Sequence, residues 1–312
     1  VIKTDLNTYA STVKSLSVRL INLIAVANTL EVLCGDVGNA FLYGKTNEKV
    51  YVVAGPEFDK HEGKRMIVDR SLYGLKSSAA RFHEHLSVKL RNLGFRPSKA
   101  DPDLWLRKTN GYYEYIARFV DDVIAFSKDP MAIMKDLEKN YVMKGVGKPQ
   151  YYLGGDVVEL NDPWNKEGIY TAFSAETYIT NCIPKMCEMV GLVEFKKYKT
   201  PFAEDYHPEL DESDLLGPAD ISKFKSLIGS GNWLITLGRF DIQYAISSLS
   251  QYSMAPKKGH MSALHRVFGY LNRYADGKIP IDVGEPPIRA HAKITKGQNW
   301  IEFYRDAEED VP

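Results

Sequence analysis

Two adjacent aspartates, Asp121 and Asp122, interrupt a run of aromatic and β-branched residues that spans residues 112–127. Such a run predicts a β-hairpin, and the acidic pair predicts its tip. Burying two neighbouring carboxylates among apolar residues is costly unless something compensates their charge. A divalent cation does so, because Mg²⁺ prefers one or two carboxylates together with substrate phosphates. A solvated turn, where Asp is common, is the other interpretation, and the doublet alone leaves both open.

A third carboxylate, Asp36, follows a short apolar segment and precedes a glycine-containing stretch, residues 37–41. An acid at the end of a strand can face a ligand while nearby backbone N–H groups approach a phosphate. An Asp at such a place can equally cap a helix. The two acidic sites share a function only if the fold brings them together, and sequence spacing does not decide this.

The rest of the chain predicts mixed α and β structure followed by a helical part. Strands are predicted at residues 49–54, 112–127 and 151–160, and helices at 77–93, 130–141, 177–190, 221–253 and 260–274. Pro184 is expected to break or kink the helix in which it lies. This order of elements predicts an α+β fold with a helical appendage.

The charge distribution leaves room for a nucleic-acid partner although the formal net charge is zero. Residues 64–108 hold 11 Lys and Arg against 4 Asp and Glu, and residues 221–278 hold 8 against 2. Residues 201–220 hold 7 acidic residues and no Lys or Arg. A phosphate backbone needs a basic surface and not a basic average, although ordinary solvated faces would give the same counts.

Cysteine usage and hydropathy bear on the compartment. The three cysteines form no CxxC pair, which favours reduced thiols over metal ligation and fits a reducing, intracellular compartment. No run approaches the ~20 apolar residues that a membrane span needs, so no membrane partner is expected. Val1 opens the chain without a signal peptide or an initiator Met, so we expect an intracellular, non-secreted protein that is an excerpt of a longer polypeptide.

Several short motifs follow one another in a fixed order along the chain. They are DVGNAFLYG at residues 36–44, SLYGLK at 71–76, FVDD at 119–122, YYLGG at 151–155, SLIG at 226–229, LGRFDI at 237–242 and VFGYL at 267–271. Together, and at these spacings, they resemble the reverse transcriptases of copia-type LTR retrotransposons. The resemblance runs from about residue 7 to residue 280 and covers most of the chain.

The resemblance implies a right-hand polymerase fold. Residues 1–170 would form partial fingers and a palm with a four-strand-type sheet, and residues 171–278 would form a mainly helical thumb/connection region. Residues 279–312 would be a linker toward an absent RNase H domain. The function implied is RNA-directed DNA polymerisation, a nucleotidyltransferase activity, by a segment of a retrotransposon polyprotein.

The family's catalytic positions fall on Asp36, Asp121 and Asp122, which would hold two Mg²⁺ (or Mn²⁺) ions. One ion would activate the primer 3′-hydroxyl and the other would steady the leaving pyrophosphate. In a regular strand Asp122 would point away from Asp121, so we expect Asp36 and Asp121 to be the main ligands.

The family's nucleotide-binding positions fall on residues 37–41, namely Val37, Gly38, Asn39, Ala40 and Phe41. The backbone amides of Gly38 and Asn39 would approach the triphosphate. Phe41 would be the steric gate that excludes a 2′-hydroxyl, with a core aromatic as the alternative role.

Contacts with nucleic acid are implied at two further places. Leu153 and Gly154 would position the primer strand as the primer grip, and Lys76 and Arg81 would contact nucleic acid. The implied partners are an RNA or DNA template-primer and deoxynucleoside triphosphates, together with the RNase H and integrase parts of a parent polyprotein. The implied location is the cytoplasm, in the virus-like particle of the retroelement.

Some features depart from the family pattern. Residues 77–80 read Ser-Ser-Ala-Ala where the family often has Gln-Ala-Pro-Arg, and Phe240 stands where it often has Pro. By comparison with the family, we expect that the upstream finger strands and an RNase H core are not included in these residues, and the acidic residues 306–310 resemble a solvated run more than a nuclease site. The alternative function is therefore a catalytically inactive remnant that at most binds RNA or template-primer duplex.

Two other kinds of site are disfavoured by spacing. The Gly44-Lys45-Thr46 sequence resembles the end of a phosphate-binding loop, but that motif needs Gly five residues before Gly44, where Asn39 stands. The pairs His83/His85 and His260/His265 are two and five residues apart, which puts their rings on different sides of a helix. Core or surface roles are therefore favoured over metal ligation for these histidines.

Overall fold

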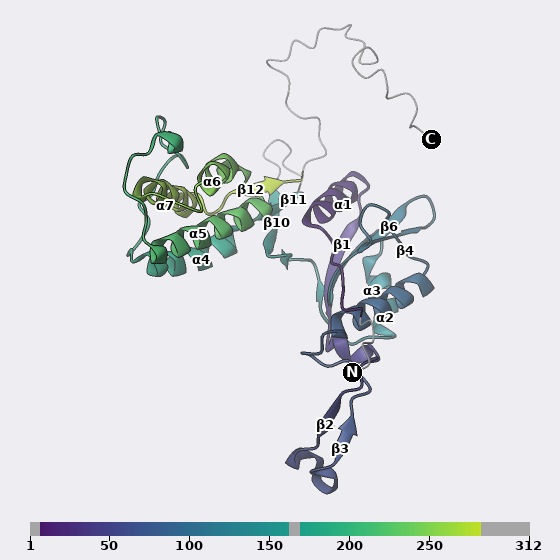
Figure 1. Ribbon diagram of the computed structural model, residues 1–312. Helices are drawn as coiled ribbons and strands as arrows, with labels where there is room; N and C mark the ends of the chain where they lie inside the picture. Colours follow the sequence, from purple (N-terminus) through teal and green to yellow (C-terminus); the bar gives the residue numbers. More distant parts are fainter. Residues whose placement is uncertain (1–6, 162–168, 282–312) are drawn as a thin grey trace, which may run out of the picture. The chain divides into compact units, whose positions relative to one another are not determined.

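The computed structural model describes residues 7–161 and 169–281, and a six-stranded antiparallel sheet organises the first part of the chain (Figure 1). Its strand order is β4-β5-β6-β7-β1-β8. The strands are β1 Glu31–Val37, β4 Arg96–Pro97, β5 Leu104–Lys108, β6 Tyr113–Phe119, β7 Asp122–Ser127 and β8 Met143–Gly147. The sheet is broader than the four-strand type implied by the resemblance, because β4 and β5 extend one edge.

Helices cover both faces of this sheet, which explains the unbroken apolar runs in its central strands. On one face, Ile116 and Val123 pack in the cluster that contains α2 (Ser78–Asn92) and α3 (Pro130–Glu138). On the other face, Ala117 and Ile124 pack with residues of α1 (Ser15–Ala27). Consecutive residues of β6 and β7 thus point to opposite faces, as strand geometry requires.

Two short elements lie between β1 and α2. The 3₁₀ segment η1 (Ala40–Tyr43) follows β1 directly and packs against α2. A separate two-stranded hairpin then forms from β2 (Tyr51–Val53) and β3 (Arg65–Ile67), with the 3₁₀ segment η2 (Pro56–His61) between the strands. The strand predicted at 49–54 is therefore confirmed.

A second, four-stranded sheet follows, with the order β12-β11-β10-β9. Its strands are β9 Tyr151–Tyr152, β10 Gly155–Asn161, β11 Ile169–Ser174 and β12 Lys278–Pro280. Residues 153 and 154 form the two-residue turn between β9 and β10. The boundary expected at residue 170 falls within β11, so the division into functional parts stays a prediction.

The second half of the chain is helical, as predicted, with two differences. Its elements are α4 Glu176–Val190, η3 Pro208–Leu210, α5 Pro218–Thr236, η4 Phe240–Ile242, α6 Gln243–Ser250 and α7 Lys258–Arg273. The expected break at Pro184 is wrong, because α4 runs through it and gives up one backbone hydrogen bond. The helix expected over 221–253 divides at Gly238, whose φ of 116° other residues rarely adopt.

Two expectations concern the limits of the described chain. None of the helices in residues 7–161 and 169–281 is long and apolar enough to cross a membrane. The acidic run at 306–310, and the linker from residue 282 onward, lie outside the described residues.

Candidate active site

The fold brings the three predicted catalytic carboxylates to one end of the central sheet. Asp36 lies near the end of β1 and is the cross-strand partner of Asp122 at the start of β7. Asp121 lies in the turn just before β7, and its carbonyl oxygen accepts a hydrogen bond from the Val37 amide at 2.9 Å. Directly opposed residues of an antiparallel pair extend to the same face, so Asp36 and Asp122 share a side of the sheet.

The turn that carries Asp121 has a strained backbone. Phe119 pairs with Asp122, which leaves Val120 and Asp121 as a two-residue hairpin loop. Val120 has a φ of 56°, a region that β-branched residues rarely adopt. The hairpin is confirmed, but only Asp121 lies in its loop, since Asp122 already belongs to the strand. Strain of this kind is typical of functional turns.

The electrostatics of the three carboxylates are mutually unfavourable. Burial raises the pKa of Asp36, the charge of Asp121 raises it further, and the charge of Lys144 opposes the rise. Burial also raises the pKa of Asp122, and the charges of Asp121 and Asp36 add to this increase. The acids are therefore close enough to repel one another, and a cation between them would relieve the repulsion.

Lys144 is a member of this site that the sequence did not indicate. It lies on β8, on the far side of β1 from Asp122, and is paired in register with Asp36. A Cβ built on Gly38 would lie 2.7 Å from Lys144 Cε and 3.2 Å from Nζ, so the lysine stem lies over that glycine. A lysine in a short strand carries no motif, and only the strand pairing connects it to the acids.

The residues present fit a divalent cation in part. Within residues 7–161 and 169–281, no three His, Cys, Asp or Glu side chains are grouped so that they could hold a metal ion. Mg²⁺, however, commonly uses one or two carboxylates and completes its shell with water and substrate phosphates. The opposed pair Asp36 and Asp122, with Asp121 beside them, could supply these carboxylate ligands.

The predicted nucleotide-binding residues surround η1. Asn39 has a left-handed φ of 53° and begins the 3₁₀ segment, while Val37 and Ala40 are buried. The Gly38 amide donates to the Val142 carbonyl oxygen at 2.9 Å, which corrects the expectation that this N–H faces the phosphates.

The predicted gate residue, Phe41, lies among aromatic side chains. Its ring centroid is 4.6 Å from that of Tyr73 and 6.4 Å from that of Phe82. Phe82 is buried in the cluster under α2, whereas Tyr73 is 61% exposed. Phe41 is therefore partly buried, with one contact to the core and one to the exposed ring of Tyr73. The sequence did not indicate that Tyr73 would be its neighbour.

Ser77 and Ser78, which depart from the family pattern, make hydrogen bonds within the fold. Ser77 donates its backbone N–H to Glu48 Oε1 at 3.2 Å, and its hydroxyl contacts the same oxygen. The hydroxyl of Ser78 donates to the Leu72 carbonyl oxygen at 2.6 Å. Both serines are buried, so neither offers a side chain to a ligand.

The two cations predicted to contact nucleic acid differ in their surroundings. Lys76 is exposed in the turn that precedes α2. Arg81 is largely buried and forms an ion pair with Glu84 at 3.0 Å. Lys76 is therefore accessible to a phosphate, whereas the Arg81 guanidinium already has an acidic partner.

The predicted primer grip is a tight turn beside the acids. Leu153 and Gly154 both have positive φ, 51° and 84°, as in the type I′ turns that favour two-residue hairpins. A hollow of about 570 Å³ has both this turn and Asp122 in its wall, and we call it the central hollow. It is lined by Thr12, Val13, Lys14, Ser15, Phe119, Asp122, Tyr151, Tyr152, Leu153, Gly154 and Trp233.

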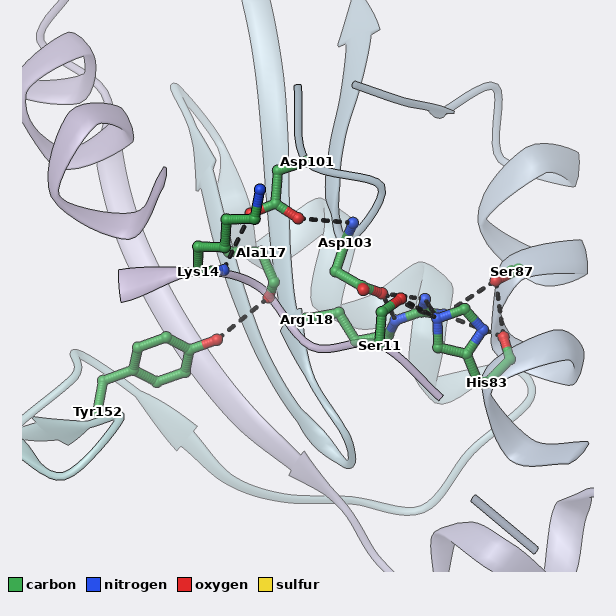
Figure 2. A network of polar contacts seen from close by, with 9 residues as sticks. All are labelled: Ser11, Lys14, His83, Ser87, Asp101, Asp103, Ala117, Arg118 and Tyr152. Atoms are coloured by element: carbon green, nitrogen blue, oxygen red, sulfur yellow. Dashed lines mark hydrogen bonds and ion pairs between the residues drawn. The ribbon is translucent and has the colours of Figure 1, made fainter. Parts of the chain in front are cut away.

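Three of the four histidines considered above, His83, His85 and His260, have hydrogen-bonding partners in this fold. His85 Nδ1 lies 3.0 Å from the Tyr141 hydroxyl, and buried His260 places Nε2 2.9 Å from the Pro208 carbonyl oxygen. His83 belongs to a buried polar network with Asp103 and Arg118 (Figure 2). The expectation of core or surface roles agrees with these contacts.

Comparison with protein families gives one match over most of the chain. Residues 2–201 match the family model described as reverse transcriptase (RNA-dependent DNA polymerase). The matched range includes the three carboxylates, η1 and the turn at residues 153–154.

Individual relatives are polyproteins and proteins of transposons. The chain is 29% identical over 241 residues to the putative transposon Ty5-1 protein of Saccharomyces cerevisiae, covering 76% of this chain and 74% of that one. It is 26% identical to the retrovirus-related Pol polyprotein from transposon RE1 of Arabidopsis thaliana, covering 85% of this chain and 17% of the relative. It is also 26% identical to the corresponding polyprotein from transposon TNT 1-94 of Nicotiana tabacum, covering 84% and 20%. The chain thus spans about a fifth of these two Pol polyproteins.

Proposed function

The chain belongs to the reverse transcriptase (RNA-dependent DNA polymerase) family, and from that premise we propose that it adds deoxynucleotides to a primer 3′-hydroxyl on an RNA or DNA template. Its homologues are Pol polyproteins of copia-type retrotransposons, so the proposed parent is a polyprotein of that kind. The RNase H and integrase parts of such a parent are proposed partners, and the cytoplasmic virus-like particle is the proposed location.

One observation carries this proposal: Asp36 and Asp122 are cross-strand partners, with Asp121 in the adjoining turn and the central hollow beside them. Burial raises the pKa of both residues, the charge of Asp121 raises both further, and the charge of Asp36 adds to the rise at Asp122, so the group is unfavourable without a cation. The arrangement supports Asp36, Asp121 and Asp122 as the residues that hold two Mg²⁺ or Mn²⁺ ions. When bound, these ions would activate the attacking hydroxyl and neutralise charge on the leaving pyrophosphate.

The protein's own contribution is placement of the reacting groups. Phe41 would lie against the sugar at C2′, where its ring leaves no room for a 2′-hydroxyl. The turn formed by Leu153 and Gly154 would hold the primer strand at the edge of the central hollow, within reach of Asp122. Lys76 would contact a backbone phosphate. Lys144, paired with Asp36, would keep part of the acidic charge balanced before substrate binds.

The division of labour along the chain is part of the proposal. Residues 1–170 would provide the palm and partial fingers, and residues 171–278 the thumb/connection region. The hairpin of β2 and β3 supports a fingers role, since it is a separate two-stranded sheet that follows η1 in sequence.

A second candidate is a catalytically inactive remnant that binds RNA or template-primer duplex. One observation favours it, namely that no three metal-binding side chains are grouped within the described part of the chain. The two candidates share the family and the nucleic-acid ligand, and they differ in whether nucleotides are incorporated.

Primer extension separates the two candidates. The 312-residue chain would be mixed with poly(rA)–oligo(dT) and labelled thymidine triphosphate, with and without Mg²⁺. Incorporation that requires the metal supports the polymerase. No incorporation, together with intact duplex binding in a fluorescence anisotropy titration, would favour the remnant.

A further inference from the structure

A buried ion pair lies three residues from the acidic turn. Arg118 on β6 is 1% exposed, and Asp103, just before β5, is completely buried. The guanidinium Nε donates to Asp103 Oδ1 at 3.0 Å, and Nη2 also contacts that oxygen. None of these residues belongs to the motifs that identify the family, and the mechanism above does not use them.

The same guanidinium reaches helix α2. Its Nη1 donates to the His83 carbonyl oxygen and to the Ser87 hydroxyl, each at 3.0 Å, and Nη2 contacts His83 Nε2. Figure 2 shows these contacts converging on one point between the strands and the helix. The planar fork of an arginine can make all of them at once, which a lysine cannot do.

The backbone of Arg118 is fixed as well. Its N–H donates to the Asp103 carbonyl oxygen at 3.0 Å, and its carbonyl oxygen accepts from the Val13 amide at 3.0 Å. The segment before α1 is itself held, because the Lys14 amide donates to Asp101 Oδ2 at 2.9 Å. The backbone of Arg118 is therefore attached to the segment before β5 and to the segment before α1, immediately before the strained turn that contains Asp121.

Stability alone does not account for this arrangement. Removing two charges from water is so unfavourable that an apolar pair of similar volume is often equally stable or more stable. A buried ion pair instead favours one geometry over its alternatives, since any displacement leaves a charge without its partners. Here the geometry that it defines is that of β6 relative to α2.

Strand β6 and helix α2 each connect the ion pair to the proposed site. Strand β6 ends at the turn with Asp121, and α2 carries Phe82, whose ring is near Phe41. Phe82 directly precedes His83, whose carbonyl oxygen Arg118 binds. A shift of α2 against β6 would therefore change the separation between the acids and the gate residue.

We propose that Arg118, held by Asp103, is a positioning residue that fixes the acidic turn relative to helix α2 and so to the nucleotide-binding segment. This inference rests on the proposed function. It predicts that the ion pair matters for metal binding and turnover much more than for folding.

The test uses the full 312-residue chain and a matched ion pair as control. The double variant Arg118→Met with Asp103→Leu removes both charges at similar volume. The control is Arg107→Met with Glu114→Leu, since Arg107 Nε donates to Glu114 Oε2 at 2.7 Å across the same two strands, β5 and β6, but far from the turn. Arg118→Lys is a third variant, which keeps the charge but loses the fork.

Three quantities are measured for each variant. Circular dichroism gives the melting temperature, electron paramagnetic resonance gives the affinity for Mn²⁺, and primer extension gives kcat and KM for thymidine triphosphate. We expect the double variant to melt close to wild type, to bind Mn²⁺ ~10-fold more weakly, and to lose ~100-fold in kcat with a smaller change in KM. Arg118→Lys should lose kcat and Mn²⁺ affinity in the same direction, whereas the control should keep both.

The outcomes separate the positioning role from the proposed function. Wild-type kcat and Mn²⁺ affinity in the double variant would overturn the inference. Wild-type values of both in Arg118→Lys would also overturn it, because the positive charge at residue 118 alone would then be sufficient. An equal loss in the Arg107 control would do the same. If the double variant fails to fold, Arg118→Lys decides the matter. Absence of both Mn²⁺ binding and incorporation in the wild type would instead overturn the proposed function, and the positioning role with it.

Discussion

Asp36 and Asp122 are direct cross-strand partners in the antiparallel pair β1–β7, so their carboxylates leave the sheet on the same face. Like charges at directly opposed positions destabilise a sheet. The cation site proposed above would account for this arrangement, because a bound cation would offset the repulsion.

The first prediction is that Asp36→Asn stabilises the metal-free protein. The pKa of Asp36 is raised in the folded state by burial and by Asp121, so its ionisation weakens the fold as pH rises through the raised pKa. At pH 7 we expect the melting temperature of Asp36→Asn to exceed that of wild type by about 2 °C. Glu138→Gln, an exposed change on α3, is the control and should have no such effect.

Added Mg²⁺ should reverse this order. A cation that binds the folded state stabilises it in proportion to occupancy, and Asp36→Asn would bind it less well. Scanning calorimetry with and without Mg²⁺ measures both effects. A variant that is less stable than wild type without the metal would contradict the repulsion assigned to this pair.

The second prediction concerns Asp121→Asn. Loss of this carboxylate should lower the primer-extension rate by ~10²- to 10³-fold, the scale of several kcal/mol of charge stabilisation. Binding of template-primer should change little, because that binding depends on basic residues and on salt. Extension assays and anisotropy titrations of the same preparation measure the two quantities. Wild-type-like extension would remove Asp121 from the metal site.

The third prediction is that Phe41→Ala admits ribonucleotides. Without the ring, a 2′-hydroxyl would meet no obstacle at the proposed sugar position. We expect the preference for deoxynucleotides, as a ratio of kcat/KM values, to fall by ~10- to 200-fold. Incorporation of thymidine and ribosyl-thymine triphosphates on the same template gives this ratio. Unchanged selectivity would assign Phe41 to the core alone.

The fourth prediction is that Tyr73 supports the gate. The ring centroid of Tyr73 lies 4.6 Å from that of Phe41, the proposed gate, and Tyr73 is otherwise largely exposed. Tyr73→Ala should lower sugar selectivity by about 3- to 10-fold, a contribution on the scale of one aromatic pair. Tyr73→Phe should behave as wild type, because the hydroxyl is not part of the ring contact.

The matched control for Tyr73 is its neighbour Leu72. Leu72 is 38% exposed, and its carbonyl oxygen accepts a hydrogen bond from the Ser78 hydroxyl in the turn before α2. Leu72→Ala leaves this backbone contact intact. That variant should keep the wild-type selectivity. Equal losses in Leu72→Ala and Tyr73→Ala would show that the loop as a whole, and not the ring, affects Phe41.

The sequence was sufficient where local patterns determine structure. The hairpin around Asp121 and the strand that ends near Asp36 were both predicted, because strand-forming residues and acidic breaks are local signals. Their proximity was not predicted, because it depends on β1 pairing with β7 over a separation of about ninety residues. Motif order suggested a common site only through the resemblance.

Side-chain partners from distant segments could not be predicted. Lys144 reaches Asp36 only because β8 is the edge strand beside β1, and Arg118 meets Asp103 across β5 and β6. A buried arginine such as Arg118 contradicts the apolar pattern of its strand, and only the position of its acidic partner, Asp103, explains why it can be buried there. Pro184 shows the opposite case, since the packing of α4 overrides a local signal that favours a break.

The fifth prediction is a change in acid stability when the Arg118–Asp103 pair is removed. Burial alone would raise the pKa of Asp103, but hydrogen bonding by His83, Ser11 and Arg118, with the charge of Arg118, lowers it from 3.8 to about 2. A depressed pKa contributes stability above the unfolded value and loses it as pH falls toward the folded value. Relative to the protonated form, ionised Asp103 should therefore stabilise the fold by about 2 kcal/mol at neutral pH, and this difference should disappear between about pH 4 and pH 2.

Urea denaturation at a series of pH values measures this contribution. The unfolding free energy of wild type should fall more steeply between about pH 4 and pH 2 than that of Arg118→Met with Asp103→Leu. The other carboxylates titrate in both proteins and cancel in the difference. The Arg107→Met with Glu114→Leu control keeps Asp103 and Arg118, so it should retain the steep wild-type slope. Equal slopes for wild type and the Arg118 double variant would mean that the partners of Asp103 do not stabilise its ionised form. The attraction between Asp103 and Arg118 would then be too weak for the proposed positioning role.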